Sequence, residues 1–374
     1  MNKIHMVDLV NQYKAIKTEI DLAIRETIEQ GAFINGPAVG QFREELSAYL
    51  EVPHVVACAN GTDALQVALM ALDLQAGDEV ITSNFTFIAT VEVIVLLGMK
   101  PVLVDVDPRT FNLDVEEVRK AISPRTKVIM PVHLFGQSAP MNEIIKIGRE
   151  NNIAVIEDAA QALGAYYNFP DGQSLRAGTI GDIGTASFFP SKNLGCFGDG
   201  GALFTRDEKL AKKLQMIVNH GSKIKYFHDL IGVNSRLDTI QAAILRVKLK
   251  HLDSYNSARQ AAAAYYNDHL MGHPDILIPG LSGTGTHIYH QYTLRILNGR
   301  RDKLKAALAG LGIPSMVYYP LPLSLQKAFN ESGYKKGDFP VTEQLCDEVL
   351  SLPMHTELRM DQLEFIIKSL LANI

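Results

Sequence analysis

The sequence of 374 residues contains few cysteines: Cys58, Cys196 and Cys346 are widely spaced, and no pair of them has the C-x-x-C spacing. This scarcity disfavours a disulfide framework and a zinc site, and it suits a reducing compartment. Runs of Lys and Arg are also missing, and the net charge is a mild −5, which argues against a nucleic-acid-binding surface.

Long hydrophobic segments are equally scarce. The longest apolar stretch, near Val91–Met99, contains Glu92 and is too short to span a bilayer. The N-terminal residues reach the charge of Asp8 before an apolar core of signal-peptide length can form. We therefore expect a cytoplasmic protein with no membrane or nucleic-acid partner.

The apolar pattern predicts an α/β fold. Short β-branched runs alternate with amphipathic segments, which is typical of a mostly parallel sheet covered by helices on both faces. Residues 1–250 are expected to form this large domain, with seven strands, and residues 251–374 a smaller α+β domain. Single helices are predicted over Tyr13–Gln30 and from about Arg236 to Leu270, and a C-terminal strand over Ser315–Tyr319.

Two segments of the large domain carry the chemistry. Asp158 ends the apolar strand Ala154–Glu157, and Lys192 follows a second strand and enters the glycine-rich stretch 193–201. A lysine amine can hold the aldehyde of pyridoxal phosphate as a Schiff base, and a carboxylate can keep the pyridine nitrogen protonated. Each residue also has a plainer interpretation, Lys192 as a surface lysine and Asp158 as a helix N-cap.

Other enzyme classes fit these segments less well. Asp158 could belong to a nucleotide hydrolase, but the G-x-x-x-x-G-K-[ST] loop that such an enzyme needs is missing. A dinucleotide dehydrogenase would need G-x-G-x-x-G after its first strand, and no such motif follows it.

Several smaller signals agree with a cofactor of this kind. Gly61 and Thr62 open a helix whose free N–H groups could hold a phosphate, and Ser187 is a second candidate phosphate ligand. Gln161 could bond the ring hydroxyl or cap the backbone near Asp158. Phe87 could lie against the pyridine ring or be an ordinary core residue.

With these residues in place, the chain resembles the fold-type-I pyridoxal phosphate enzymes, and among them the nucleotide-sugar aminotransferases of the DegT/DnrJ/EryC1/StrS family. The matching stretches occur in the family's order along nearly the whole chain, and they are 59–65, 78–81, 85–87, 157–161, 187–192, 198–202 and 234–237.

The resemblance implies a role for each of these residues. Lys192 would carry the cofactor and shuttle the proton, Asp158 would face the pyridine nitrogen, Gln161 the ring hydroxyl and Phe87 the ring face. Gly61, Thr62 and Ser187 would hold the phosphate. Asn234, which also reads as a helix N-cap together with Ser235, would reach the phosphate of the neighbouring subunit, so the family implies a homodimer with a shared active site.

Within the family, residues 190–201 resemble the branch that aminates carbon 3 of the sugar, and in particular the transaminases that act on UDP-2-acetamido-2-deoxy-3-oxo-glucuronate. That group tends to have His-Tyr-Pro where this chain has Tyr318-Tyr319-Pro320. Tyr318 and Tyr319 are therefore candidate sugar contacts, and Arg236 is a candidate partner of the sugar carboxylate.

The resemblance implies a ping-pong transamination with glutamate and a keto nucleotide sugar as substrates, in which pyridoxamine phosphate is the second form of the cofactor. Alternatives are an aminotransferase for dTDP-3-keto-6-deoxyhexoses and a regulatory relative without activity. The intact set of Lys192, Asp158 and Gln161 disfavours the regulatory protein, and Lys192 disfavours the family's dehydratase branch, which replaces this lysine.

Overall fold

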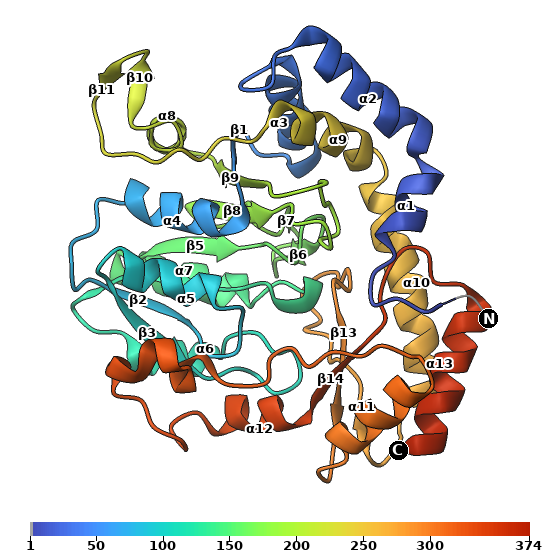
Figure 1. The fold of residues 1–374 in the computed structure, drawn as a ribbon. Coiled ribbons are helices and arrows are strands. Elements are labelled where there is room, and N and C mark those ends of the chain that lie inside the picture. The colour runs from blue at the N-terminus through green and yellow to red at the C-terminus, as the bar shows by residue number, and fades with distance from the viewer. Residues whose placement is uncertain (1–2) are drawn as a thin grey trace.

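The computed structural model describes residues 3–374, apart from the side chain of Glu331. Its centre is a seven-stranded sheet with the order β1-β9-β8-β5-β4-β2-β3, which runs from β1 near the top of Figure 1 to β3 near the bottom. The strands are β1 (His54–Cys58), β2 (Glu79–Ser83), β3 (Lys100–Val104), β4 (Thr126–Met130), β5 (Ala154–Asp158), β8 (Ile183–Ser187) and β9 (Gly201–Thr205).

All neighbouring pairs in this sheet are parallel except those of β9, which is antiparallel to both β1 and β8. The strands are short and mostly apolar, and all except the edge strand β3 are almost completely buried, because helices cover both faces. The predicted seven-stranded, mostly parallel α/β fold is confirmed.

Alternate strand residues face different helices, as the pleat requires. Val56 and Cys58 pack in one apolar cluster with α4 (Gly61–Ala71), α5 (Ala89–Leu96) and α8 (Glu208–Ile217). Val55 and Ala57 pack in another cluster on the opposite face. The helices on that face are α3 (Pro37–Leu50), α6 (Val115–Ala121), α7 (Met141–Asn151) and α9 (Thr239–Leu249).

The C-terminal part surrounds a three-stranded antiparallel sheet of β12 (Ile276–Leu277), β13 (Tyr292–Ile296) and β14 (Val349–Leu352). Its helices are α10 (Leu252–Leu270), α11 (Arg301–Gly310), α12 (Pro340–Glu348) and α13 (Met360–Asn373). Ile4 is buried in the same apolar cluster as side chains of α13, and Figure 1 shows the N-terminal segment passing beside this helix. The division of the chain near residue 250 stays a prediction.

The remaining elements are short or peripheral. Two small hairpins form separate two-stranded sheets: β6 (Tyr166–Asn168) with β7 (Ser174–Arg176), and β10 (Ser222–Ile224) with β11 (Phe227–His228). Three 3-10 turns cover Leu134–Gly136, Leu323–Leu325 and Lys327–Ser332. No helix within residues 3–374 is both long and apolar enough to traverse a bilayer.

Three predicted elements differ from the structure. The N-terminal helix is broken at Ile16 into α1 (Leu9–Ala15) and α2 (Lys17–Gln30), and the long helix is broken between Leu249 and Leu252 into α9 and α10. The expected strand Ser315–Tyr319 is reduced to one bridge between Met316 and Ser351. Apolar periodicity continues across both breaks, because Tyr13 of α1 packs in one cluster with Ile20 of α2, and both α9 and α10 bury apolar side chains. The pattern alone therefore predicted single helices.

Candidate functional site

The candidate site lies at the carboxyl ends of the parallel strands. Asp158 ends β5 and Ser187 ends β8, while the segment that leads to Phe87 follows β2 and the turn that leads to Gly61 follows β1. In open α/β sheets, ligands bind at this edge, beyond the strand ends.

Asp158 is only 5% exposed, and its carboxylate has two donors. The hydroxyl of Thr90 donates to Oδ2 at 2.9 Å, and the backbone N–H of Ala160 donates to Oδ1 at 3.1 Å. Asp158 does not cap a helix, because a turn and not a helix follows β5. The plainer interpretation of this residue is therefore wrong.

Gln161 is held in one orientation by its neighbours. Its Oε1 accepts the backbone N–H of Phe135 at 2.8 Å, so its amide nitrogen is left to donate, and the structure aims this nitrogen at the hydroxyl of Tyr319, 3.3 Å away. Gln161 does not form a capping box with Asp158. Its amide is consistent with the expected hydrogen bond to an oxygen on the cofactor ring.

Aromatic side chains line the neighbouring part of the site. Phe85 is 1% exposed and belongs to the core, whereas Phe87 is 55% exposed, so Phe87 is not an ordinary core residue. The ring of Tyr319 lies 5.8 Å from Phe85 and 6.5 Å from Phe87, centroid to centroid, and Tyr318 packs edge-on against Tyr319 at 6.1 Å. An exposed ring beside an acid and an amide is available to stack on a planar ligand.

The first turn of α4 contacts the end of β8. Asn60 caps this helix by accepting the N–H of Asp63 at 2.8 Å, and Gly61 and Thr62 form its first turn. A Cβ added to Gly61 would lie 2.6 Å from the Cβ of Ser187, so only glycine allows this close approach. The expected phosphate ligands Gly61 and Ser187 therefore lie side by side at a helix N-terminus, where an anion is stabilised.

Lys192 lies in a turn closed by its own N–H to the carbonyl of Phe189 at 2.8 Å. Burial lowers the pKa of its amine to about 8, although the charge of Asp158 acts in the opposite direction. At neutral pH a larger fraction of this amine is therefore uncharged and nucleophilic than in a surface lysine. The interpretation of Lys192 as a surface lysine is not supported.

The residue after Lys192 anchors this turn to the C-terminal part. The amide nitrogen of Asn193 donates to Asn256 Oδ1 at 2.6 Å and to the carbonyl of Ile288 at 3.3 Å, and its oxygen lies 3.2 Å from His290 Nδ1. Burial, together with the charges of Lys192 and Arg259, holds the pKa of His290 well below its usual range. These contacts fix the backbone from which the Lys192 side chain extends.

Asn234 and Arg236 lie beside α4. In the described chain, no hydrogen bond joins either of them to the other candidate site residues. Ser235 between them accepts the N–H of Ala59, just before the turn to Gly61, at 3.1 Å. Asn234 is exposed, and neither it nor Ser235 caps α9, because the cap is Asp238. Arg236 donates to Asn219 Oδ1 at 3.1 Å.

Sequence reasoning missed two residues near Asp158. One is Thr90. The other is Glu157, which is fully buried with His133: the distance from Glu157 Oε2 to His133 Nε2 is 2.8 Å. Glu157 also accepts the backbone N–H groups of Gly178, Ile180 and Gly181. The N–H of Ala139 donates to His133 Nδ1, so the other ring nitrogen carries the proton toward Glu157.

These residues fit pyridoxal phosphate. An amine of lowered pKa, a buried acid, a donor amide, an exposed aromatic ring and a glycine-based anion cradle meet at one sheet edge. These are the chemical groups that the aldehyde, ring nitrogen, ring oxygen, ring face and phosphate of this cofactor require. Their assignment to those roles remains a prediction.

Comparison with known proteins gives the following likenesses. A profile of the DegT/DnrJ/EryC1/StrS aminotransferase family matches residues 14–371. The chain is 45% identical over 369 residues to a pleiotropic regulatory protein of Geobacillus stearothermophilus, with 98% of this chain and 97% of that protein covered. It is 43% identical over 371 residues to a UDP-2-acetamido-2-deoxy-3-oxo-D-glucuronate aminotransferase of Pseudomonas aeruginosa, with 98% and 99% covered.

A third relative and a solved structure are also similar to this chain. The chain is 40% identical over 360 residues to a dTDP-3-amino-3,4,6-trideoxy-alpha-D-glucose transaminase of Streptomyces venezuelae, with 96% of this chain and 93% of that protein covered. A crystal structure of NtdA from Bacillus subtilis with bound cofactor PMP superimposes with a TM-score of 0.91 at 31% identity, and the match covers 100% of this chain and 85% of that chain.

Proposed function

This chain belongs to the DegT/DnrJ/EryC1/StrS aminotransferase family, and from that membership we propose that it moves the amino group of glutamate to carbon 3 of a keto nucleotide sugar of the UDP-2-acetamido-2-deoxy-3-oxo-glucuronate type. It is a sugar aminotransferase, and its cofactor is pyridoxal phosphate. The amino donor, the sugar, the nucleotide and the residues that act on them are what we propose.

When bound, the cofactor supplies an electron-accepting ring that stabilises negative charge at the carbon losing its proton. We propose that Lys192 acts on that proton as general base and acid, which its lowered pKa favours at neutral pH. Asp158 would hold the proton of the ring nitrogen, Gln161 would donate to the ring oxygen, and Phe87 would cover the ring. Gly61, Thr62 and Ser187 would orient the phosphate.

One observation supports an acidic sugar. Arg236 is half-buried, its Nε has no hydrogen-bond partner in the described chain, and no acidic side chain within residues 3–374 forms an ion pair with it. A half-buried guanidinium without an anion favours binding of a carboxylate, which can accept two parallel N–H bonds. Its position beside the turn to Gly61 is consistent with a ligand that extends from the cofactor.

The test compares two keto sugars on the wild type and on Arg236→Met. We expect the variant to raise KM for the glucuronate-type UDP sugar by about tenfold to a hundredfold, because a half-buried charge-assisted pair is lost. The half-reaction with glutamate and the KM for a dTDP-3-keto-6-deoxyhexose should change little. The matched control is Arg246→Met, since Arg246 pairs with Glu45 on the opposite face from α4.

An equal loss with both sugars and with glutamate would instead show that Arg236 supports the structure. A wild type that uses only the dTDP sugar would favour the second candidate, a dTDP-3-keto-6-deoxyhexose aminotransferase. The observation that favours this candidate is Tyr318, which stands where the glucuronate group tends to have histidine. Calorimetric titration with UDP and with dTDP separates the nucleotides without any keto sugar.

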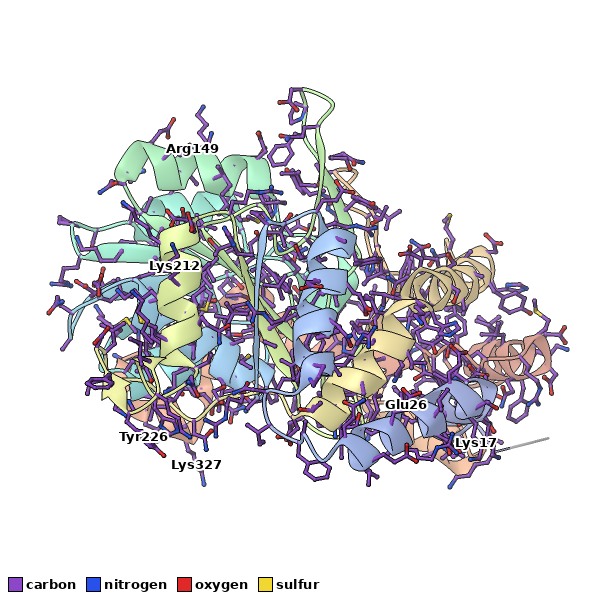
Figure 2. All side chains as sticks on the ribbon, turned by 90° about the horizontal axis from the view of Figure 1, so that it is seen from above. Lys17, Glu26, Arg149, Lys212, Tyr226 and Lys327 are labelled. Carbon is purple, nitrogen blue, oxygen red and sulfur yellow. The ribbon has the colours of Figure 1, made fainter. Side chains whose placement is uncertain are left out.

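We also propose that the enzyme is a homodimer whose active sites contain residues of both subunits. Exposed apolar side chains support an interface: Tyr226 is 81% exposed, Phe227 69% and Ile231 89%. Tyr226 lies at the outer edge of the molecule in Figure 2, on the β10–β11 hairpin. Large exposed apolar groups of this kind mark interaction surfaces, and the exposed Asn234 follows them in the chain.

Mixing two inactive variants tests the shared site. If Asn234 serves the partner's phosphate, then hybrids of Lys192→Ala and Asn234→Ala contain one site in which both residues are intact. Random reassortment of equal amounts should restore about a quarter of wild-type activity, because half of the dimers are hybrids with one intact site each. No recovery after verified subunit exchange, or a monomer of 41.2 kDa in sedimentation, would contradict the proposal.

A further inference from the structure

We propose that Thr90 is a positioning residue that holds the carboxylate of Asp158 in the orientation in which it meets the pyridine nitrogen. This inference rests on the proposed role of Asp158. It assigns the reaction a side chain that lies 68 positions from Asp158 in the chain and belongs to a different element.

The backbone of Asp158 is fixed on both sides, but its side chain is not. Its N–H donates to the carbonyl of Pro131 at 2.9 Å, and its own carbonyl accepts the N–H of His133 at 3.0 Å. On the other side, the N–H of Ala159 donates to the carbonyl of Thr185 at 2.9 Å. None of these bonds determines how the carboxylate turns about its own side-chain torsions.

The hydroxyl of Thr90 supplies that constraint. It donates to Asp158 Oδ2 at 2.9 Å, while Ala160 N–H donates to Oδ1, so each oxygen has one donor from a different element. Thr90 is the only side chain in the described part of the protein that hydrogen-bonds this carboxylate. An ionised acid is acceptor-only, so the lone pairs that neither donor occupies are left for a ligand.

Thr90 is the second residue of α5, so the residue four positions earlier lies outside the helix. A threonine inside a helix often bonds the carbonyl four residues earlier, as Thr27 of α2 does with Ala23 at 2.9 Å. Thr90 instead directs its hydroxyl out of α5 toward β5, and its other neighbour is the hydroxyl of Thr86 at 3.5 Å. At 1% exposure it has no access to water, so the bond to Asp158 satisfies a group that would otherwise be buried without a partner.

The start of α5 connects the hydrogen bond between Thr90 and Asp158 to Phe87, the residue expected to stack on the cofactor ring. The N–H of Thr90 donates to the carbonyl of Phe87 at 3.3 Å, at the start of α5. The segment from Phe87 to Thr90 thus presents an aromatic face to the ring and a hydroxyl to the acid that binds the ring nitrogen. A shift of α5 would move both contacts together.

The test uses Thr90→Val, which removes the hydroxyl and keeps the shape, and Thr90→Ser, which keeps the hydroxyl. We expect Thr90→Val to weaken pyridoxal phosphate binding about tenfold, the loss associated with one charge-assisted hydrogen bond, and Thr90→Ser to restore it to within about threefold. In a 15N NMR titration of the protein loaded with ring-15N-labelled cofactor, the ring nitrogen should lose its proton at a lower pH in Thr90→Val than in the wild type.

The matched control is Thr82→Val, because Thr82 is equally buried on β2 and donates to the carbonyl of Met130 at 2.7 Å, away from Asp158. This variant should lose comparable stability without moving the titration. If Thr90→Val does not fold, Thr90→Ala provides the same comparison with a smaller side chain. An unmoved titration and unchanged binding in a folded Thr90→Val or Thr90→Ala would overturn the proposal.

Asp158→Asn distinguishes this failure from a failure of the proposed function. If Asp158→Asn shifts the titration and Thr90→Val does not, the role of Thr90 is wrong and that of Asp158 stands. If neither variant shifts it, the assignment of Asp158 to the ring nitrogen is itself wrong.

Discussion

Replacing Lys192 with alanine is expected to lower turnover by at least about 10³-fold, because the variant loses both the amine that binds the cofactor covalently and the group that moves the proton. The cofactor should still bind through its phosphate, its ring nitrogen and its ring face. Borohydride reduction followed by peptide mapping should find the cofactor adduct on the Lys192 peptide in the wild type and on no peptide in the variant.

The chain contains a matched control for this experiment. Lys248 is buried, at 1% exposure, whereas Lys192 is half-buried, and burial lowers the pKa of the Lys248 amine to about 8 as well, but this amine donates to the carbonyl of Gly195. Lys248→Met should therefore keep the adduct on Lys192, even if the protein loses stability. Undiminished turnover by Lys192→Ala, or an adduct on Lys248 in the wild type, would refute the assignment of Lys192.

Replacing Glu157 with glutamine should have the largest effect on the fold, lowering the free energy of unfolding by about 2–4 kcal/mol, because one or two buried N–H donors lose their acceptor. The carboxylate accepts from three backbone N–H groups and from His133, and neither Glu157 nor His133 is exposed. The NH2 group of a glutamine would face some of these N–H donors. Those donors would then have no acceptor, because the site is closed to water. Urea denaturation followed by far-UV circular dichroism measures the change.

Glu79 provides the comparison, since its carboxylate is also mostly buried but pairs with the exposed side chains of Lys100 and Arg125. We expect Glu79→Gln to cost about 1 kcal/mol or less, because solvent screens its partners. If Glu157→Gln and Glu79→Gln lowered the free energy of unfolding equally, the buried N–H donors would not be the reason that Glu157 is needed. Activity per folded molecule in Glu157→Gln then reports whether the neighbouring Asp158 has moved.

The sequence predicted the sheet and the main site residues for different reasons. The strands were recognisable because short β-branched runs separated by amphipathic helical segments are typical of parallel sheets and of few other architectures. Lys192, Asp158 and Gln161 stood out because their chemistry and their motifs are local. Phe87 needed the structure, since only its exposure separates it from the buried Phe85.

Thr90 and Glu157 could not be found in the same way. The bond from Thr90 to Asp158 and the loop that supplies three N–H groups to Glu157 depend on which elements the sheet order brings together. A threonine near a helix start and a glutamate at a strand end are common in proteins and indicate no particular partner by themselves. The helix breaks at Ile16 and near Lys250 were missed for a related reason, because apolar spacing continues across them.

The burial of Ile4 against α13 has a consequence for biosynthesis. The ribosome makes Ile4 long before its partners on α13, so this contact must wait until those residues emerge. At about 5–20 residues per second that wait lasts tens of seconds. The strands of the central sheet are all complete by Thr205, so the nascent chain can assemble that sheet while the segment around Ile4 remains undocked and open to chaperones and proteases.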